Sequence, residues 1–130
     1  MSGSNVKLPG EAYSPNIRAR FWLTDGSKSY LGVGRIELLE KIDEYGSISQ
    51  AAKSMGMSYK KAWKLIDELN GMYSEPMIVK VKGGKSGGGS LLTETGRKTV
   101  EEFKCIEVDL IEFLQKKSEE LFLDNKTSML

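Results

Sequence analysis

The sequence predicts a mainly α-helical fold with a small β component: a winged helix-turn-helix with an N-terminal β-hairpin and a long C-terminal helix. Three observations support this fold class. Two short segments with helix-capping residues follow one another, at 47–56 and 58–73. Two strand-like segments separated by glycines come next, between residues 77 and 92. A helical pattern of apolar residues then extends from about residue 95 to 123.

Length and composition exclude several classes of protein. The chain has 130 residues, 39% of them hydrophobic, which suffices for one core but not for two comfortable domains. It has no histidine and one cysteine, Cys105, which excludes His-based nucleophile systems, the commonest metal ligand and an internal disulfide. No long apolar run or signal-peptide core occurs. We therefore expect a soluble, cytoplasmic non-enzyme without metal, cofactor or membrane partner.

The N-terminal region combines a polar arm with a hairpin. Residues 1–16 are rich in Ser, Gly and Pro, so we expect a disordered arm. From 17 to 31, apolar and polar residues alternate around an Asp25-Gly26 turn signal, which is typical of a β-hairpin. Trp22 lies on the face opposite its apolar neighbours, and a contact across the hairpin or with another subunit is favoured over ligand stacking.

Three helices are predicted next. Residues 33–45 place apolar side chains on one broad side, and Gly46 follows the end of this helix. Ser47 and Ser58 are good N-caps for two further helices, which are joined by a turn at Gly56-Met57. Two helices in this arrangement form a helix-turn-helix, and the second of them would be the recognition helix.

The glycine-rich segment contains Gly84-Lys85-Ser86 and invites comparison with a phosphate-binding loop. Such a loop needs an earlier glycine at position 79, which is a valine, and it leads into a helix, whereas this segment leads into a strand. We therefore predict the tip of a wing. Its small residues would let the backbone and Lys85 approach DNA phosphates, and we expect it to be flexible before binding and ordered afterwards.

The near-neutral net charge of +1 conceals two oppositely charged regions. Residues 58–98 hold eight Lys or Arg and four acids, whereas residues 99–130 hold eight acids and four lysines. The basic region contains the predicted recognition helix and wing. The acidic region is the predicted last helix, which would lie away from the DNA-binding face.

Three segments in order resemble one family. They are "GSISQAAK", "SYKKAW" and "GGKSGGG", and the likeness extends from about Ile17 to the helix after Gly96. This combination resembles the N-terminal DNA-binding domain of ModE-type molybdate-responsive transcriptional regulators. A looser similarity links the helix-turn-helix to LysR-type regulators, which lack this wing. The resemblance implies a winged-helix dimer whose recognition helices enter major grooves and whose wings touch the backbone or minor groove.

The resemblance also implies site residues. On the recognition helix, the implied DNA contacts are Ser58, Tyr59, Lys60, Lys61 and Lys64. On the wing, they are Lys82, Gly83, Gly84, Lys85, Ser86 and Gly87. Candidate phosphate contacts are Ser47, Ser49 and Gln50, although helix capping is a sufficient role for Ser47 and Gln50.

Two further expectations come from the resemblance. Trp63 matches a tryptophan of the family, and we expect it to pack against the core more than to contact DNA. The best-known members carry C-terminal domains that bind molybdate or tungstate. Because this sequence ends at Leu130 after a single helix, we expect neither oxyanion to bind this chain.

The last helix is longer than a winged-helix core requires. A helix over about residues 95–123 would span roughly 42 Å, so its far half needs a partner, and a second copy of the same helix is the economical choice. The winged domain with its dimerisation helix would therefore cover residues 17–123, followed by a disordered tail at 124–130. The predicted dimer contacts are Phe103, Ile106, Leu110, Phe113, Leu114 and Leu121.

These features together predict a sequence-specific transcriptional regulator. As a homodimer it would bind a pseudo-palindromic site on double-stranded DNA. The alternative is a winged-helix module for protein interaction or non-specific DNA architecture, because the fold hosts such roles. An enzyme is a distant third, since the carboxylates show no spacing suited to acid-base catalysis.

Overall fold

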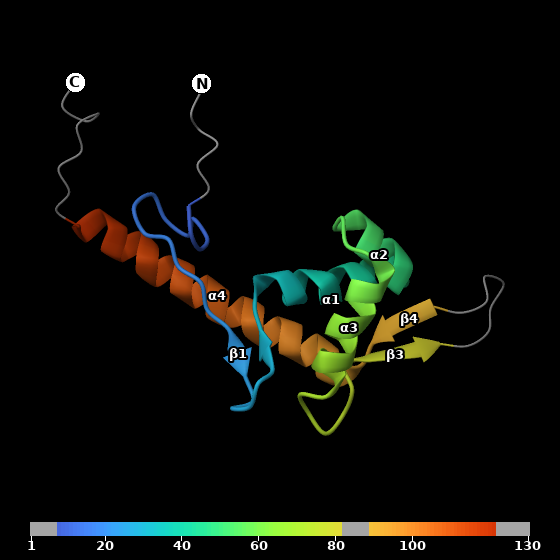
Figure 1. Cartoon of the computed structure of the whole chain (residues 1–130). Helices are drawn as coiled ribbons and strands as arrows, with labels where there is room; N and C mark the ends of the chain where they lie inside the picture. The colour runs from blue at the N-terminus through green and yellow to red at the C-terminus, as the bar shows by residue number, and fades with distance from the viewer. Residues whose placement is uncertain (1–7, 82–88, 122–130) are drawn as a thin grey trace. The chain divides into compact units, whose positions relative to one another are not determined.

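The structure, a computed structural model, describes residues 8–81 and 89–121 (Figure 1). Along the chain the elements are β1 (Leu23–Thr24), β2 (Tyr30–Leu31), α1 (Val33–Tyr45), α2 (Ile48–Ser54), α3 (Tyr59–Asn70), β3 (Ile78–Val81), β4 (Gly89–Leu92) and α4 (Glu94–Glu120). Both sheets are two-stranded and antiparallel, β1 with β2 and β3 with β4. This order confirms the predicted fold class: mainly helical, with small hairpins and a long C-terminal helix.

The chain divides into two compact units, which are described separately. The first unit is Phe21–Cys105 and contains the helix-turn-helix and the wing strands. The second combines the described residues of Met1–Arg20 with those of Ile106–Leu130. Helix α4 contributes its first turns to one unit and its remaining turns to the other. From sequence alone we expected a single domain over residues 17–123.

The core of the first unit forms where α1, α2 and α3 meet. Helix α1 ends at Gly46 in the left-handed conformation (φ 65°), as predicted. The fully buried side chains include Leu31, Ile36, Leu38, Leu39, Ile42, Ala51, Ala62, Ile66, Leu69 and Met77. Small residues on α2 and α3 allow the two helices to approach closely, so the inner face of α3 is fixed by packing.

Aromatic stacking joins α4 to this core. The rings of Phe21 and Phe103 are stacked with centroids 4.4 Å apart, and Phe103 is 1% exposed. Thr93 precedes the helix, and its hydroxyl accepts a hydrogen bond from the Gly96 amide (3.0 Å) and donates one to the Pro76 carbonyl (2.6 Å). The first turns of α4 are thereby fixed to the segment that enters the wing.

The wing strands are anchored at two points. Ile78 pairs with Leu92 at the base of the hairpin, and both side chains are buried. The Ser90 amide donates to the Gly46 carbonyl (3.0 Å), and a side chain at Gly89 would overlap that same carbonyl oxygen. Glycine at position 89 is therefore required for β4 to lie against the end of α1.

The N-terminal hairpin is shorter than its sequence pattern suggests but lies where it was predicted. Leu23 pairs with Leu31, and Thr24 pairs with Tyr30. In the turn, the Asp25 carboxylate accepts hydrogen bonds from the Ser27 amide and hydroxyl. The Trp22 and Tyr30 rings meet edge to face at 6.4 Å, so Trp22 makes the contact across the hairpin that was favoured for it.

The second unit differs from the expectation of a disordered arm over residues 1–16. Among the described residues from 8 onward, Glu11 and Ala19 form an antiparallel bridge, with hydrogen bonds of 2.8 and 3.0 Å. The Asn16 amide donates to the Ser118 hydroxyl of α4 (3.2 Å). The contact between Asn16 and Ser118 joins residues 102 positions apart, which local composition does not reveal. The expected disorder of residues 1–7 and of the tail 124–130 falls outside the described residues.

Candidate nucleic-acid interface

The turn between α2 and α3 fixes the relative orientation of the two helices. Gly56 adopts φ 65°, a conformation that favours glycine, and its amide donates to the Lys53 carbonyl (3.1 Å). The Met57 amide donates to the Ala52 carbonyl (2.9 Å), and the Met57 side chain packs against the core. The two helices thus form the predicted helix-turn-helix, in which α3 is the second helix (Figure 1).

Both helices of the motif carry the predicted N-caps. The Ser47 hydroxyl accepts a hydrogen bond from the Gln50 amide (3.1 Å), and the Ser58 hydroxyl accepts one from the Lys61 amide (3.0 Å). Gln50 and Ser49 are exposed, whereas Ser47 is half-buried. Capping therefore occupies the hydroxyls of Ser47 and Ser58, and leaves the side chains of Ser49 and Gln50 accessible to a phosphate.

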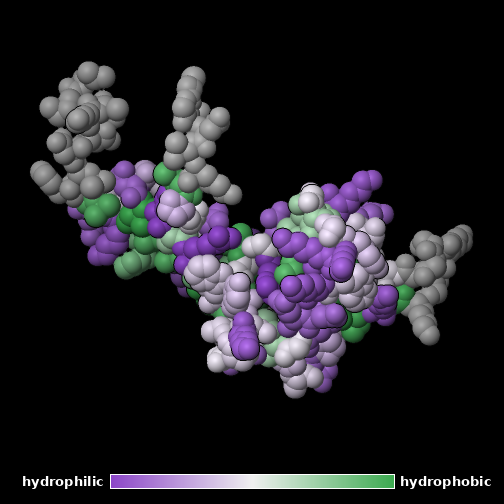
Figure 2. Space-filling model, in the orientation of Figure 1, coloured by the Kyte–Doolittle hydropathy of each residue, from purple (hydrophilic) through white to green (hydrophobic). Residues whose placement is uncertain are grey.

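The lysines of α3 lie on the accessible side of the helix. Ala62, Ile66 and Leu69 are fully buried, while Lys60 and Lys64 project from the opposite side at 100° per residue and are exposed. Lys61 is exposed beside them. Within the described part of the chain, none of these three lysines forms an ion pair. Figure 2 shows a mainly hydrophilic surface over this helix.

A salt bridge offsets the charge of one of the acids on α3. Arg35 of α1 donates from Nη1 to Oε1 of Glu68 at 2.6 Å, and its guanidinium also lies 5.1 Å from the centre of the Tyr30 ring. Glu68 therefore has its negative charge paired within the protein. Among residues 8–81 and 89–121, the positive charges of the three neighbouring lysines have no such partner, so this helix presents a net basic surface.

An aromatic pair borders the lysines at the start of α3. Tyr59 is exposed, and Trp63, one turn later, is half-buried against the core. Their rings meet edge to face at 6.2 Å. Lys80 of β3 extends over the Trp63 ring, with its ammonium 4.7 Å from the ring centre. Core packing was the role expected for Trp63; the contact with Lys80 was not foreseen, because the two residues are far apart in sequence.

The structure describes the two strands of the basic wing, β3 and β4. Lys80 faces Ser90 in the hairpin register, and Val81 faces Gly89. The candidate wing contacts Lys82, Gly83, Gly84, Lys85, Ser86 and Gly87 lie outside the described residues. Through the contact of Lys80 with Trp63, the structure brings together α3 and strand β3 of the wing.

The candidate dimer residues fall into two groups. Phe103 is buried by Phe21, and Leu114 is 9% exposed, so neither is available on the surface of the single chain, in contrast to the prediction. Ile106, Phe113 and Leu121 are exposed, and Leu110 is half-buried. At helical spacing Ile106, Leu110 and Phe113 lie on one side of α4, and Leu121 follows directly after the helix ends. Figure 2 shows hydrophobic surface on this part of the helix.

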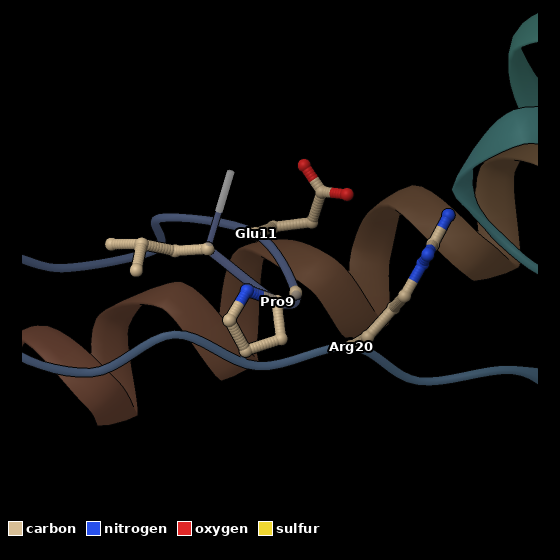
Figure 3. Close-up of a pocket in the computed structure, with 5 residues that line it drawn as sticks. Pro9, Glu11 and Arg20 are labelled. Atoms are coloured by element: carbon tan, nitrogen blue, oxygen red, sulfur yellow. The ribbon is translucent and has the colours of Figure 1, made fainter. Parts of the chain in front are cut away.

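A pocket in the second unit lies apart from the DNA-binding candidates in sequence. It has a volume of about 380 Å³ and is lined by Leu8, Pro9, Gly10, Glu11 and Arg20. In Figure 3 the Arg20 side chain extends away from Pro9. Over residues 8–81 and 89–121, no cluster of three potential metal ligands occurs. Nor is any helix in these ranges long and apolar enough to cross a membrane.

Two side chains have clearly shifted pKa values. Burial, together with the hydrogen bond that its hydroxyl donates to Glu107 (2.7 Å), raises the pKa of Tyr13 well above its usual range. Hydrogen bonds from Ser27 lower the pKa of the exposed Asp25 carboxyl. Neither residue belongs to the basic surface.

Comparison with known proteins adds independent information on this architecture. The family profile described as "Bacterial regulatory helix-turn-helix protein, lysR family" matches residues 33–97. This range starts at α1 and ends in the first turn of α4, so it contains the helix-turn-helix and the wing strands.

Three relatives extend the likeness. The molybdenum transport protein ModE of Azotobacter vinelandii is 42% identical over 103 residues, which is 79% of this chain and 38% of the relative. The molybdenum-pterin-binding protein MopB of Rhodobacter capsulatus is 35% identical, covering 82% and 39%. The DNA-binding transcriptional dual regulator ModE of Escherichia coli K12 is 38% identical, covering 70% and 33%. The chain thus matches less than half the length of each of these relatives.

Proposed function

The chain belongs to the LysR family of bacterial regulatory helix-turn-helix proteins, and from this premise we propose that it is a sequence-specific DNA-binding transcriptional regulator. The observation that carries this proposal is the exposed row of lysines on α3, unpaired in the described residues, on a helix whose opposite side is fixed in the core. Such a helix fits the major groove, where lysine can donate to guanine acceptors or to flanking phosphates.

The contacts divide by the chemistry they can perform. Lys60, Lys61 and Lys64, with the neighbouring Ser58 and Tyr59, are proposed to face the major groove. Ser49 and Gln50, at the start of α2, are proposed to contact phosphates. Lys82 to Gly87 are proposed to form the tip of the wing and to contact the backbone or minor groove. Phosphate contacts supply affinity, and base contacts supply sequence preference.

We propose that the protein acts as a homodimer. Ile106 and Phe113 expose large apolar side chains on one side of α4, and Leu121 exposes another directly after the helix ends. Burying them against the same surface of a second chain would remove this area from water. Two recognition helices related by a two-fold axis would read a pseudo-palindromic operator. We propose that its target genes belong to a molybdenum-related process, and the names of the relatives support this.

Fluorescence anisotropy tests the proposal directly. Labelled duplexes from upstream of the gene itself and of neighbouring transport genes are compared with shuffled duplexes at physiological salt. A specific regulator is expected to bind a native duplex at least about a thousandfold more tightly than the shuffled one. The variant carrying both Lys60→Ala and Lys64→Ala should lose most of this binding. Lys41→Ala, which removes one lysine charge from α1, should retain it.

The other outcomes identify the alternative roles. Equal binding to every duplex, falling steeply with salt, would instead indicate a non-specific architectural module. Absence of binding to all duplexes would favour a protein-interaction module. Analytical ultracentrifugation tests the dimer: Phe113→Glu should shift a dimer to monomers, and a monomeric parent protein would overturn that part of the proposal.

A further inference from the structure

The contact between Lys80 and Trp63 joins the wing to the recognition helix. Lys80 stands on β3, and Trp63 lies on α3, 17 positions earlier in the sequence. The Lys80 ammonium is 4.7 Å from the centre of the indole ring, within the range of an attractive cation–π interaction. Both residues belong to the unit Phe21–Cys105.

The orientation of the indole ring is itself determined by its neighbours. One part of Trp63 packs against the hydrophobic core, and the Tyr59 ring meets it edge to face at 6.2 Å. The remaining part of the ring is accessible, and the Lys80 ammonium lies over the ring. The ring is therefore a fixed platform, whereas a lysine side chain on a strand is normally mobile.

Lys80 is otherwise a free cation in the described structure. It is exposed, its strand neighbour across the hairpin is Ser90, and no carboxylate among residues 8–81 and 89–121 pairs with it. A cation–π contact leaves the ammonium hydrogens able to donate to another acceptor, because the ring attracts the charge without accepting a conventional hydrogen bond. The ammonium can thus bind an anion while it stays over the indole.

We propose that Trp63 is a positioning residue that holds Lys80 ready to bind a DNA phosphate beside the groove occupied by α3. This inference rests on the proposed function and adds a phosphate contact on strand β3 of the wing. Holding the ammonium in place before binding lowers the entropy lost when the phosphate contact forms. Trp63 acts through Lys80 and makes no base contact of its own.

A first experiment tests the contact without DNA. In the NMR spectrum of the free protein, ring current from the indole should shift the Lys80 side-chain methylene protons upfield of ordinary lysine values. Trp63→Leu should return them to those values while the backbone spectrum stays folded, and Trp63→Phe should retain part of the shift. Ordinary lysine values in the parent protein would overturn the proposal.

A second experiment measures the effect on DNA binding by a double-mutant cycle. Lys80→Ala should reduce the slope of log affinity against log salt by about one. Trp63→Leu should weaken binding about two- to fivefold when Lys80 is present and leave it unchanged in the Lys80→Ala background. Trp63→Phe should fall between Trp63→Leu and the parent. As a matched control, Tyr45→Leu removes another aromatic partner of a lysine, Lys41 on α1, and should not alter binding.

The outcomes separate the two proposals. If Trp63→Leu weakens binding equally with and without Lys80, the positioning role is wrong although the protein still binds DNA. The same conclusion follows if Lys80→Ala leaves the salt slope unchanged. If the parent protein binds no duplex, the proposed function fails, and the positioning role fails with it.

Discussion

Arg35 of α1 donates to Glu68 of α3 at 2.6 Å, so the supporting helix and the recognition helix are joined by a charge-assisted hydrogen bond. The Arg35 side chain is 17% exposed and that of Glu68 is 38% exposed, which places the pair at the edge of the core. This relationship orients α3 and also offsets a negative charge on a helix proposed to meet DNA.

Removing Arg35 is expected to reduce both stability and DNA binding. Arg35→Ala should lower the free energy of unfolding by about 1 to 2 kcal/mol, because it breaks a partly buried charged hydrogen bond. It should also weaken DNA binding, since Glu68 would then repel phosphates. Adding Glu68→Gln should restore part of the binding. Denaturant unfolding and anisotropy provide the readouts, and strictly additive losses would contradict the coupling.

Lys64 and Lys85 should differ in what their removal changes. Lys64→Ala is expected to cost about 1 to 3 kcal/mol of discrimination at one base position, if Lys64 meets a base edge. Lys85→Ala should weaken binding to all duplexes alike and lower the salt slope by about one, as expected for a phosphate contact. Anisotropy with a set of singly substituted operators distinguishes them. An unchanged sequence profile for Lys64→Ala would reassign Lys64 to phosphate.

Asn70 links the end of α3 to the wing. Its side-chain oxygen accepts hydrogen bonds from the amides of Met77 (2.9 Å) and Ile78 (3.0 Å), and its amide donates to the Ile78 carbonyl (3.3 Å). Asn70→Ala should lower the free energy of unfolding by about 1 to 3 kcal/mol, because these backbone groups lose their partners. Asn70→Asp keeps the accepting oxygen and should cost less in a denaturant titration. Equal losses would show that the accepted bonds are unimportant.

Gly89 tests the close approach between the wing and α1. In Gly89→Ala the added methyl group would overlap the Gly46 carbonyl oxygen, so we expect a loss of about 1 to 3 kcal/mol in stability. Gly34 is the control: it lies in α1, and a methyl group there meets no atom within 4 Å. Gly34→Ala should be neutral or stabilise by up to about 1 kcal/mol. Thermal unfolding measures both variants, and equal midpoint temperatures for Gly89→Ala, Gly34→Ala and the parent protein would contradict this packing.

Tyr13 should make stability fall at high pH. Burial raises its pKa in the folded protein, and the hydrogen bond to Glu107 and the nearby charge of Glu11 act in the same direction, while Arg20 opposes them. The folded state therefore keeps its proton where the unfolded state loses it. The stabilisation is complete below about pH 10 and declines above that value. Hydrogen exchange of the α4 amides after Cys105 measures this stability as a function of pH. Protection should decline with rising pH in the parent protein and decline less in Tyr13→Phe. Parallel profiles of protection against pH for the two proteins would contradict the prediction.

The sequence alone determined the local elements. Helix ends depend on the caps at Ser47 and Ser58 and on the glycines Gly46 and Gly56, and the buried faces of α1 and α3 depend on apolar spacing. Each of these interactions acts within one or two helical turns, so it can be predicted from neighbouring residues in the sequence. Their order along the chain then fixes the winged helix-turn-helix. The lysine row on α3 follows equally from helical spacing.

Only the tertiary structure decided which side chains meet across the sequence. Lys80 reaches Trp63, Arg35 reaches Glu68, and Phe103 is buried by Phe21 instead of standing on a dimer surface. Tyr13 and Asn16 form hydrogen bonds with Glu107 and Ser118 of α4, although the composition of residues 1–16 indicates disorder. Such contacts depend on how whole helices and strands pack against one another. Because the packing energy comes from residues that are distant in sequence, no local sequence pattern predicts these contacts.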